Sequence, residues 1–173
     1  KLDSEAAVID GAHRGLVVRT LWLYGHRPGV RPNLVTWPLA ALLRGETVRV
    51  VTDQWGNPTL VADLARAIVQ LCRSDVSGRF HFGGSSFLSR YELVQRMASY
   101  FRLDTRSVDA VPTQRAEQAA ARPLRSGLRT DAVEGELRWT PATLEEGLAQ
   151  LATEDAFRHD FADLFDKAGA TRT

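Results

Sequence analysis

The sequence VVTDQWGNPTLVADLARAI, residues 50–68, joins two apolar patterns through a short polar segment. Apolar β-branched residues lead into DQWGNPT, residues 53–59, and an amphipathic helical pattern follows it. A strand that opens onto a helix N-terminus is common in α/β proteins, which bind ligands at such junctions. The stretch therefore predicts an α/β fold with a candidate ligand site at this junction.

Backbone geometry accounts for part of the junction. We expect Gly56 to adopt a positive φ, and Asn57 to be extended because Pro58 follows it. We expect Thr59 to cap the following helix, with Asp63 in the first turn near the positive end of the helix dipole. These roles explain the glycine, the proline and the threonine.

The remaining polar side chains, those of Asp53, Gln54 and Trp55, have no part in that geometry. A carboxylate, an amide and an indole at the end of a strand can hydrogen-bond to and stack on a polyhydroxylated or nucleotide ligand. Residue chemistry alone leaves ligand contact and a purely structural role equally open.

Strands and helices alternate along the rest of the chain, which supports the α/β class. Strands are predicted over 15–25, 47–51, 79–84 and 107–111, and helices over 4–9, 33–45, 60–73, 89–101, 140–151 and around Phe157–Phe165. Capping boxes start two of these helices, at Ser89 with Glu92 and at Thr143 with Glu146. This number of strands is small for a self-sufficient doubly wound sheet, so we expect part of the fold to lie outside the chain.

Composition is that of an ordinary soluble domain: 173 residues, 44% hydrophobic, 25% charged and a net charge of +1. That charge gives no bulk attraction to nucleic acid or to an anionic membrane, so we expect neither as a partner. Cys72 is the single cysteine, which excludes an intramolecular disulfide, and we expect it to be a small core residue. No apolar run approaches the ~18 residues of a membrane span, so a cytoplasmic protein is expected.

Several chemistries lack their motifs. The four histidines lie far apart without metal-ligand spacing, and one cysteine cannot form C-x-x-C, so no metal site is expected. G-x-S-x-G is absent, as are G-x-G-x-x-G and G-x-x-x-x-G-K-[ST]. We therefore expect no complete dinucleotide site within this chain alone.

Four segments carry a family resemblance. RTLWLYG (19–25), NLV (33–35), DQWGNPT followed by ADLA (62–65), and RPLRSGL (122–128) occur in the order found in dTDP-4-dehydrorhamnose reductases. The chain resembles these NAD(P)-dependent sugar-nucleotide reductases of the extended short-chain dehydrogenase/reductase superfamily over roughly its first 150 residues. The D-Q-x-G-x-P-T element is fairly specific, and the others gain weight from their order.

The resemblance implies the C-terminal part of a Rossmann-type fold with a mixed α/β substrate-binding lobe. Residues 1–25 would end the Rossmann-like nucleotide-binding domain. Residues 26–173 would form mostly the substrate-binding lobe, interleaved with late Rossmann elements. NADPH or NADH is the implied cofactor, with its site mostly outside this chain.

The first residue aligns with a catalytic position. KLDSE matches the segment at the end of the family's Y-x-x-x-K motif, so the resemblance implies that Lys1 is the catalytic lysine. The tyrosine, three residues earlier, would protonate the sugar oxygen as hydride arrives from the nicotinamide. Lys1 would hydrogen-bond the nicotinamide ribose and lower the pKa of that tyrosine.

Other implied site residues follow along the chain. Arg19 and Thr20 would shape the floor shared by cofactor and substrate, although Arg19 can equally be a structural ion-pair partner. Trp22 would pack on the sugar nucleotide, with a buried strand aromatic as the alternative. Asn33 would mark the edge of the substrate-binding segment, where Leu34 replaces the family's usual Phe.

The two later segments supply the remaining implied residues. Asp53, Gln54, Pro58 and Thr59 match the family's loop near the substrate. Arg122, with Ser126 in the same late loop, would either contact the substrate or fix the C-terminal helices.

The resemblance implies reduction of the 4-keto group of a dTDP-6-deoxyhexulose to give dTDP-L-rhamnose, so a dTDP-sugar is the expected substrate. A homodimer is compatible with the resemblance. Two alternatives remain open. The regulatory subunit of methionine adenosyltransferase resembles the same reductases without being a catalyst, and an isolated lobe would have no cofactor site. We expect the 173-residue chain alone to be inactive, whichever of these functions the full-length protein has.

Overall fold

The computed structural model describes residues 1–11, 13–116 and 118–170. Its helices are α1 (Leu2–Gly11), α2 (Thr36–Leu43), α3 (Val61–Arg73), α4 (Arg90–Tyr100), the 3₁₀ turn η1 (Thr113–Arg115), α5 (Asp131–Leu137), α6 (Leu144–Thr153) and α7 (Asp155–Ala168). Its strands are β1 (Leu16–Arg19), β2 (Leu23–Tyr24), β3 (Val48–Val51), β4 (Trp55–Gly56), β5 (Thr59–Leu60), β6 (Gly78–His81), β7 (Leu88–Ser89) and β8 (Val108–Val111). The predicted α/β class is confirmed.

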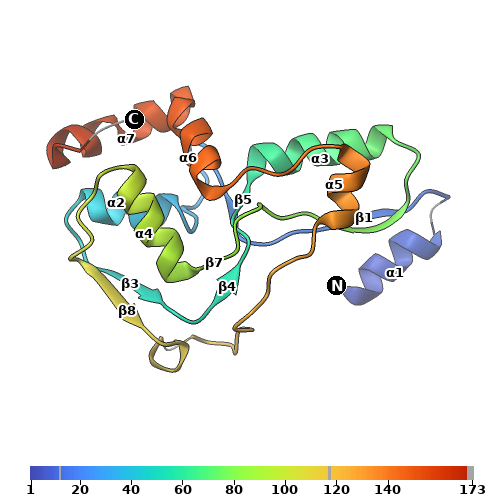
Figure 1. Ribbon diagram of the computed structural model, residues 1–173, viewed down its shortest axis with the longest axis horizontal. Helices are drawn as coiled ribbons and strands as arrows, with labels where there is room; N and C mark the ends of the chain where they lie inside the picture. Colours follow the sequence, from blue (N-terminus) through green and yellow to red (C-terminus); the bar gives the residue numbers. More distant parts are fainter. Residues whose placement is uncertain (12, 117, 171–173) are drawn as a thin grey trace.

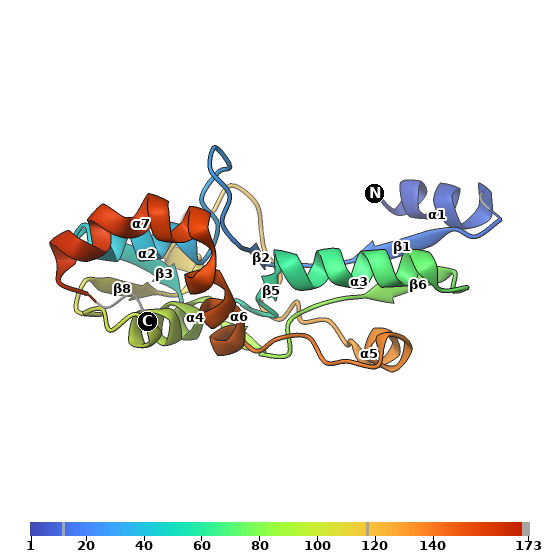
Figure 2. The same cartoon turned by 90° about the horizontal axis from the view of Figure 1, so that it is seen from above.

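The strands pair two by two. β1 pairs with β6, β2 with β5 and β3 with β8, all parallel, whereas β4 pairs with β7 antiparallel. Figures 1 and 2 show β3 and β8 with α2, α4, α6 and α7 in one half of the molecule, and β1 and β6 with α1, α3 and α5 in the other. The short pairs β2–β5 and β4–β7 lie between the halves, where the 53–59 junction runs.

Each half has its own apolar core. The larger is built on α2, α4, α6 and α7, and its fully buried members include Leu39, Leu93, Met97, Phe101, Leu144, Leu148 and Phe165. The smaller packs Ala67, Leu71, Phe82 and Val133 between α3, α5 and β6. The cores are thus set by helix faces, and the polar junction must join them.

Local signals placed several elements correctly. Both capping boxes form, with the Ser89 hydroxyl accepting from the Glu92 amide and the Thr143 hydroxyl accepting from the Glu146 amide. Gly45, at φ +71°, follows the end of α2, where its amide donates to the Leu42 carbonyl at 2.9 Å. Helix α2 begins only at Thr36, so Pro38 lies in the first turn, where no intrahelical amide bond is lost.

The predicted strand 15–25 is broken. β1 ends at Arg19 and β2 begins at Leu23, because Trp22 between them has φ +49°. A bulky residue in the left-handed region is uncommon and cannot continue a strand. The break turns the indole out of the β1 direction and places it at the junction.

Three other expectations were wrong. Gly56 does not have a positive φ; a Cβ there would lie 2.7 Å from Leu21 Cδ1 and 2.9 Å from Trp22 Cε2, so close approach requires the glycine. Thr59 does not cap α3, because the extended Leu60 is its N-cap and no side chain caps it. Cys72 is exposed, since α3 buries the neighbouring Leu71 instead.

Asn57 ties the junction to distant segments. Its side chain is buried, and Nδ2 donates to the Gly84 carbonyl at 3.0 Å and to the Ser86 carbonyl at 3.3 Å. Its Oδ1 accepts from the Leu128 amide at 2.9 Å. Thr59 adds a further link, because its hydroxyl donates to the Asn57 carbonyl and accepts from the Gly84 amide.

Within the described residues, no helix is both long enough and apolar enough to cross a membrane.

Two helical glycines provide a matched test of packing between β2 and α6. At Gly147 a Cβ would clash with the buried Tyr24 hydroxyl and lie 2.9 Å from Cζ, whereas at Gly135 it would meet nothing within 4 Å. We expect Gly147→Ala to lower the free energy of unfolding by about 1–3 kcal/mol through overpacking. We expect Gly135→Ala to raise it by roughly 0.5–1 kcal/mol through helix propensity. Denaturant titration measures both, and equal effects would contradict the packing.

Candidate functional site

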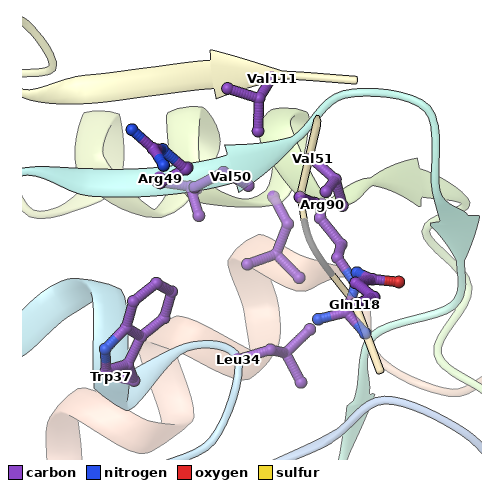
Figure 3. A pocket seen from close by; sticks show the side chains of 11 residues that line it. Leu34, Trp37, Arg49, Val50, Val51, Arg90, Val111 and Gln118 are labelled. Atoms are coloured by element: carbon purple, nitrogen blue, oxygen red, sulfur yellow. The ribbon is translucent and has the colours of Figure 1, made fainter. Parts of the chain in front are cut away.

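A cavity of about 240 Å³ lies at the carboxyl ends of the parallel strands β3 and β8, beside the N-terminus of α4 (Figure 3). Its lining residues are Leu34, Trp37, Arg49, Val50, Val51, Arg90, Leu93, Val94, Val111, Ala116 and Gln118. The walls are mostly apolar, and the polar groups come from few side chains. Carboxyl ends of parallel strands are the usual ligand edge of α/β proteins, so this cavity is the candidate site.

Arg90 brings to this cavity a positive charge for which the described residues supply no ion-pair partner. It is half-buried at the first position of α4, next to the N-cap Ser89, where the helix dipole disfavours a cation. Its Nε is buried and has no hydrogen-bond partner among the described residues. Burial lowers the pKa of Arg90, and the nearby charge of Arg122 lowers it further. An anion bound at this point would pair with the charge of Arg90 and accept a hydrogen bond from its Nε.

Trp22 lies under that guanidinium. The Arg90 Cζ is 4.9 Å from the centre of the indole ring, a cation–π arrangement. The Trp22 carbonyl accepts from the Thr59 amide at 3.1 Å, which holds the left-handed residue in place. Two residues earlier, the Thr20 hydroxyl is buried and, among the described residues, has no partner. Thus two unpaired polar atoms, on Thr20 and Arg90, lie close to Trp22 in sequence or in space.

Arg19 and Lys1 lie away from the cavity. Arg19 forms a two-pronged ion pair with Glu5, at 2.9 Å from Nε and 2.7 Å from Nη2, and Arg79 joins at 3.0 Å. The Arg19 hydrogen bond holds the pKa of Glu5 below its usual value. The geometry favours the ion-pair alternative for Arg19. Lys1 is exposed at the start of α1, in the half of the molecule opposite α2 and α4 (Figures 1 and 2).

Asn33 shapes the edge of the cavity through backbone contacts. Its Nδ2 donates to the Gly25 carbonyl at 2.6 Å, and its Oδ1 accepts from the amides of Val35 at 3.0 Å and Thr36 at 3.2 Å. The side chain is therefore engaged within the protein, and it fixes the position of the adjacent Leu34, which lines the cavity.

Asp53 and Gln54 bind the start of a distant segment. Asp53 Oδ1 accepts from the Thr113 amide at 2.9 Å and from its hydroxyl at 2.6 Å, and these bonds lower the pKa of Asp53. Gln54 is buried, and its Nε2 donates to Thr113 Oγ1 at 3.2 Å and to Gln118 Oε1 at 2.8 Å. Gln118, rather than Asp53 or Gln54, is among the lining residues.

The late loop that carries Arg122 is held by Trp55. The Trp55 amide donates to the Leu124 carbonyl at 2.7 Å, and the Ser126 amide donates to the Trp55 carbonyl at 3.0 Å. The Arg125 guanidinium lies 5.4 Å from the Trp55 ring and 5.2 Å from the Phe87 ring. Ser126 thus has a structural contact, and the exposed Arg122 is brought near Arg90.

The structure brings some predicted residues together and separates others. The Trp22 ring lies 4.9 Å from Arg90 Cζ, and Arg122 is near enough for its charge to lower the pKa of Arg90. Asp53 and Gln54 reach the cavity rim through Gln118. Pro58 and Thr59 are buried within the junction, and Lys1 is remote from them. Among the residues that the structure describes, no group of three or more His, Cys, Asp or Glu side chains could hold a metal ion.

Sequence reasoning missed Arg90 and Gln118. For Arg90 a signal existed: the capping box at Ser89 makes it the first residue of a helix, the place least suited to a cation. For Gln118 there was none, because it lies in an irregular segment and meets Gln54 only through the tertiary fold.

A second cavity, of about 440 Å³, lies between β2, the first turn of α3 and loop 25–33. It is lined mainly by apolar side chains such as Leu23, Val30, Val61 and Ala65, with Arg27 and Arg31 also contributing. Among the described residues that line it, none carries a buried side-chain polar atom without a hydrogen-bond partner. The first cavity is therefore the better candidate for a polar ligand.

Comparison with known proteins gives a consistent result. A family model described as RmlD substrate binding domain matches residues 1–157. A probable low-salt glycan biosynthesis reductase of Haloferax volcanii is 32% identical over 87% of this chain and 51% of its own length. A dTDP-4-keto-6-deoxy-D-glucose reductase of Streptomyces niveus is 38% identical over 76% of this chain and 45% of its own.

A solved structure supports the same relationship. The dTDP-4-dehydrorhamnose reductase of Bacillus anthracis, crystallised with NADP, superposes with a TM-score of 0.71 at 31% identity. The match covers 79% of this chain and 47% of that one. The chain thus spans about half the length of the relatives that it matches.

The charge on Arg90 should cost stability when no anion is bound. We expect Arg90→Met to raise the free energy of unfolding by about 1 kcal/mol, because an apolar side chain replaces a half-buried, unpaired cation. The matched control is Arg129→Met, which removes a 92% exposed arginine paired with Asp131 and should change stability by less than about 0.5 kcal/mol. Denaturant titration in low-phosphate buffer decides, and a clear loss of stability in Arg90→Met would contradict the assignment.

Proposed function

The chain belongs to the dTDP-4-dehydrorhamnose reductase family, and on that premise we propose that it is the sugar-nucleotide-binding part of an NAD(P)H-dependent reductase. The proposed reaction reduces the 4-keto group of a dTDP-6-deoxyhexulose to give dTDP-L-rhamnose. The observation that carries the proposal is the Arg90 guanidinium at the cavity beside α4, whose buried Nε has no hydrogen-bond partner in the part of the chain that the structure describes.

A nucleoside diphosphate supplies what this site lacks. The diphosphate has the charge that Arg90 and Arg122 together require, and guanidinium groups suit phosphate oxygens because they donate in pairs. The α4 N-terminus adds the positive end of its dipole, while its Arg90 and Glu92 amides already donate to the Gln54 carbonyl and the Ser89 hydroxyl. The apolar walls formed by Leu34, Val50 and Val51 suit the flat nucleobase.

The sugar end of the ligand would lie toward Trp22. The indole is half-buried beneath Arg90, so a diphosphate at Arg90 brings the attached hexose close to the ring. Sugar rings present C–H faces that pack on indoles, and this supports the substrate contact proposed for Trp22. Asn33 and Thr59 would act through the backbone that they hold, since their polar side-chain groups are engaged within the protein, and the buried Pro58 would act by stiffening the junction.

The chain holds few of the groups that a dinucleotide cofactor needs. Thr20 fits such a group in one respect, because its buried hydroxyl, just after the carboxyl end of β1, has no hydrogen-bond partner within the described ranges of the chain. Thr20 and Lys1 would contact the nicotinamide end, with Lys1 as a charge that favours proton donation to the sugar oxygen. When bound, NADPH or NADH would supply the hydride. The phosphate-binding glycines would come from a nucleotide-binding domain beyond these residues.

Nucleotide binding tests the proposal most directly. We expect the protein to bind dTDP, and Arg90→Met to weaken that binding by at least about tenfold, because a charge-assisted contact to phosphate is lost. Arg129→Met, at an exposed residue that does not line the cavity, should leave the Kd within about twofold. Isothermal titration calorimetry measures each Kd. Unaltered affinity in Arg90→Met would reject the site, and the absence of dTDP binding by the unmodified protein would reject the function.

Turnover separates a reductase from a non-catalytic binding protein. In the proposed full-length reductase, supplied with NADPH and a dTDP-4-keto-6-deoxyhexose, we expect NADPH consumption. Lys1→Met should lower kcat by at least about 100-fold, as expected for a group that supports proton transfer, while the Kd for dTDP changes little. Tight dTDP binding without NADPH consumption would favour the regulatory alternative.

A further inference from the structure

Four side chains form a continuous series of hydrogen bonds from the junction to the cavity. The Thr113 hydroxyl is 2.6 Å from Asp53 Oδ1, Gln54 Nε2 is 3.2 Å from Thr113 Oγ1, and Gln54 Nε2 is 2.8 Å from Gln118 Oε1. Gln118 then lines the cavity, at the end where Arg90 lies (Figure 3). The series joins residues 53 and 54 to a segment about 60 positions later.

The direction of every bond in this series is set by Asp53. An ionised carboxylate can only accept hydrogen bonds, and the contacts from Thr113 keep Asp53 ionised by lowering its pKa. The single hydroxyl hydrogen of Thr113 must therefore point to Asp53. That leaves a lone pair of Thr113 Oγ1 for its other neighbour, so the group facing it from Gln54 has to be a donor.

The orientation of the Gln54 amide in turn fixes the orientation of the Gln118 amide. The NH₂ of Gln54 faces both Thr113 and Gln118, and in the reverse orientation the Gln54 oxygen would meet an oxygen of Thr113. Only 3% of Gln54 is exposed, so water cannot easily repair such a mismatch. Gln118 must then offer its Oε1 to Gln54. Its Nε2 is left without a partner among the described residues.

We infer that Gln118 donates a hydrogen bond from Nε2 to an oxygen of the sugar nucleotide, and that Asp53, Thr113 and Gln54 are positioning residues that set this polarity. The inference rests on the proposed function, because it takes the ligand to be the nucleotide of that same cavity. It gives the acidic and amide residues of the DQWGNPT segment a role that acts through Gln118. The cavity then presents donors, from Gln118 and Arg90, and selects ligand groups that accept.

The Thr113 hydroxyl separates this role from simple packing. Thr113→Val keeps the shape and the backbone amide bond to Asp53 but removes the hydroxyl, so Gln54 and Gln118 lose their fixed orientation. We expect the Kd for dTDP to rise about fivefold to tenfold in Thr113→Val, the effect of one lost ligand hydrogen bond. Thr113→Ser, which keeps the hydroxyl, should restore the unmodified Kd to within about twofold.

A double-mutant cycle tests whether the effect passes through Gln118. We expect Gln118→Ala to weaken dTDP binding about tenfold, and Gln54→Met to weaken it about fivefold. In the Gln118→Ala background, Gln54→Met should have no further effect, because the group that it positions is gone. Gln118 is exposed, so its truncation leaves the fold intact, and thermal unfolding checks this for every variant.

The outcomes are distinguishable. Equal Kd values for Thr113→Val and Thr113→Ser, an unchanged Kd in Gln118→Ala, or additive effects in the cycle would each overturn the inference while leaving the proposed function in place. If the unmodified protein binds no dTDP in the same titration, the proposed function fails and the inference fails with it. Non-additive losses together with rescue by serine support both.

Discussion

The buried carboxamide of Asn57 is the constraint on which the arrangement of the two halves depends. An amide without water must find partners, and Asn57 finds them on the backbone of Gly84, Ser86 and Leu128. Segments far apart in sequence therefore have to meet at the junction. Once they do, Trp55 can pair with the strand-like stretch at residues 124–126, and the late loop reaches the α4 N-terminus. Two separate apolar cores are thereby joined through a polar centre.

Sequence patterns predicted what depends on neighbours in the chain. The capping box at Ser89 fixed the start of α4, and Gly45 marked the end of α2, because both signals lie within a few residues of their effect. They failed where the cause is distant. Gly56 is required by the approach of Trp22, and the hydroxyl of Thr59 is taken by Gly84 rather than by a helix end. No pattern within the junction carries those contacts.

In the candidate site, too, the sequence predicted local features and missed distant contacts. Residue chemistry marked Asp53 and Gln54 as more than a turn requires, and the structure engages both, with Thr113 as the shared neighbour. Their partner could not be named in advance, since it lies 60 residues later. Arg90 differs, because its unusual position is visible in the sequence: a cation stands at the first position of a helix, where the dipole disfavours it. Only the structure shows that this cation lines a cavity. The disagreement between a residue and its local rule is thus informative about binding.

The half-buried guanidinium of Arg90, whose Nε has no partner among the residues that the structure describes, also bears on how long the protein persists in a cell. A ligand that binds only the folded chain stabilises it by mass action, and the gain in the free energy of unfolding grows with the ratio of free ligand concentration to Kd. Proteases act on the opened population, which shrinks as ligand accumulates. With the proposed nucleotide as that ligand, the abundance of the protein would follow the supply of the nucleotide without a dedicated sensor, because binding at the half-buried Arg90 would also protect the folded chain.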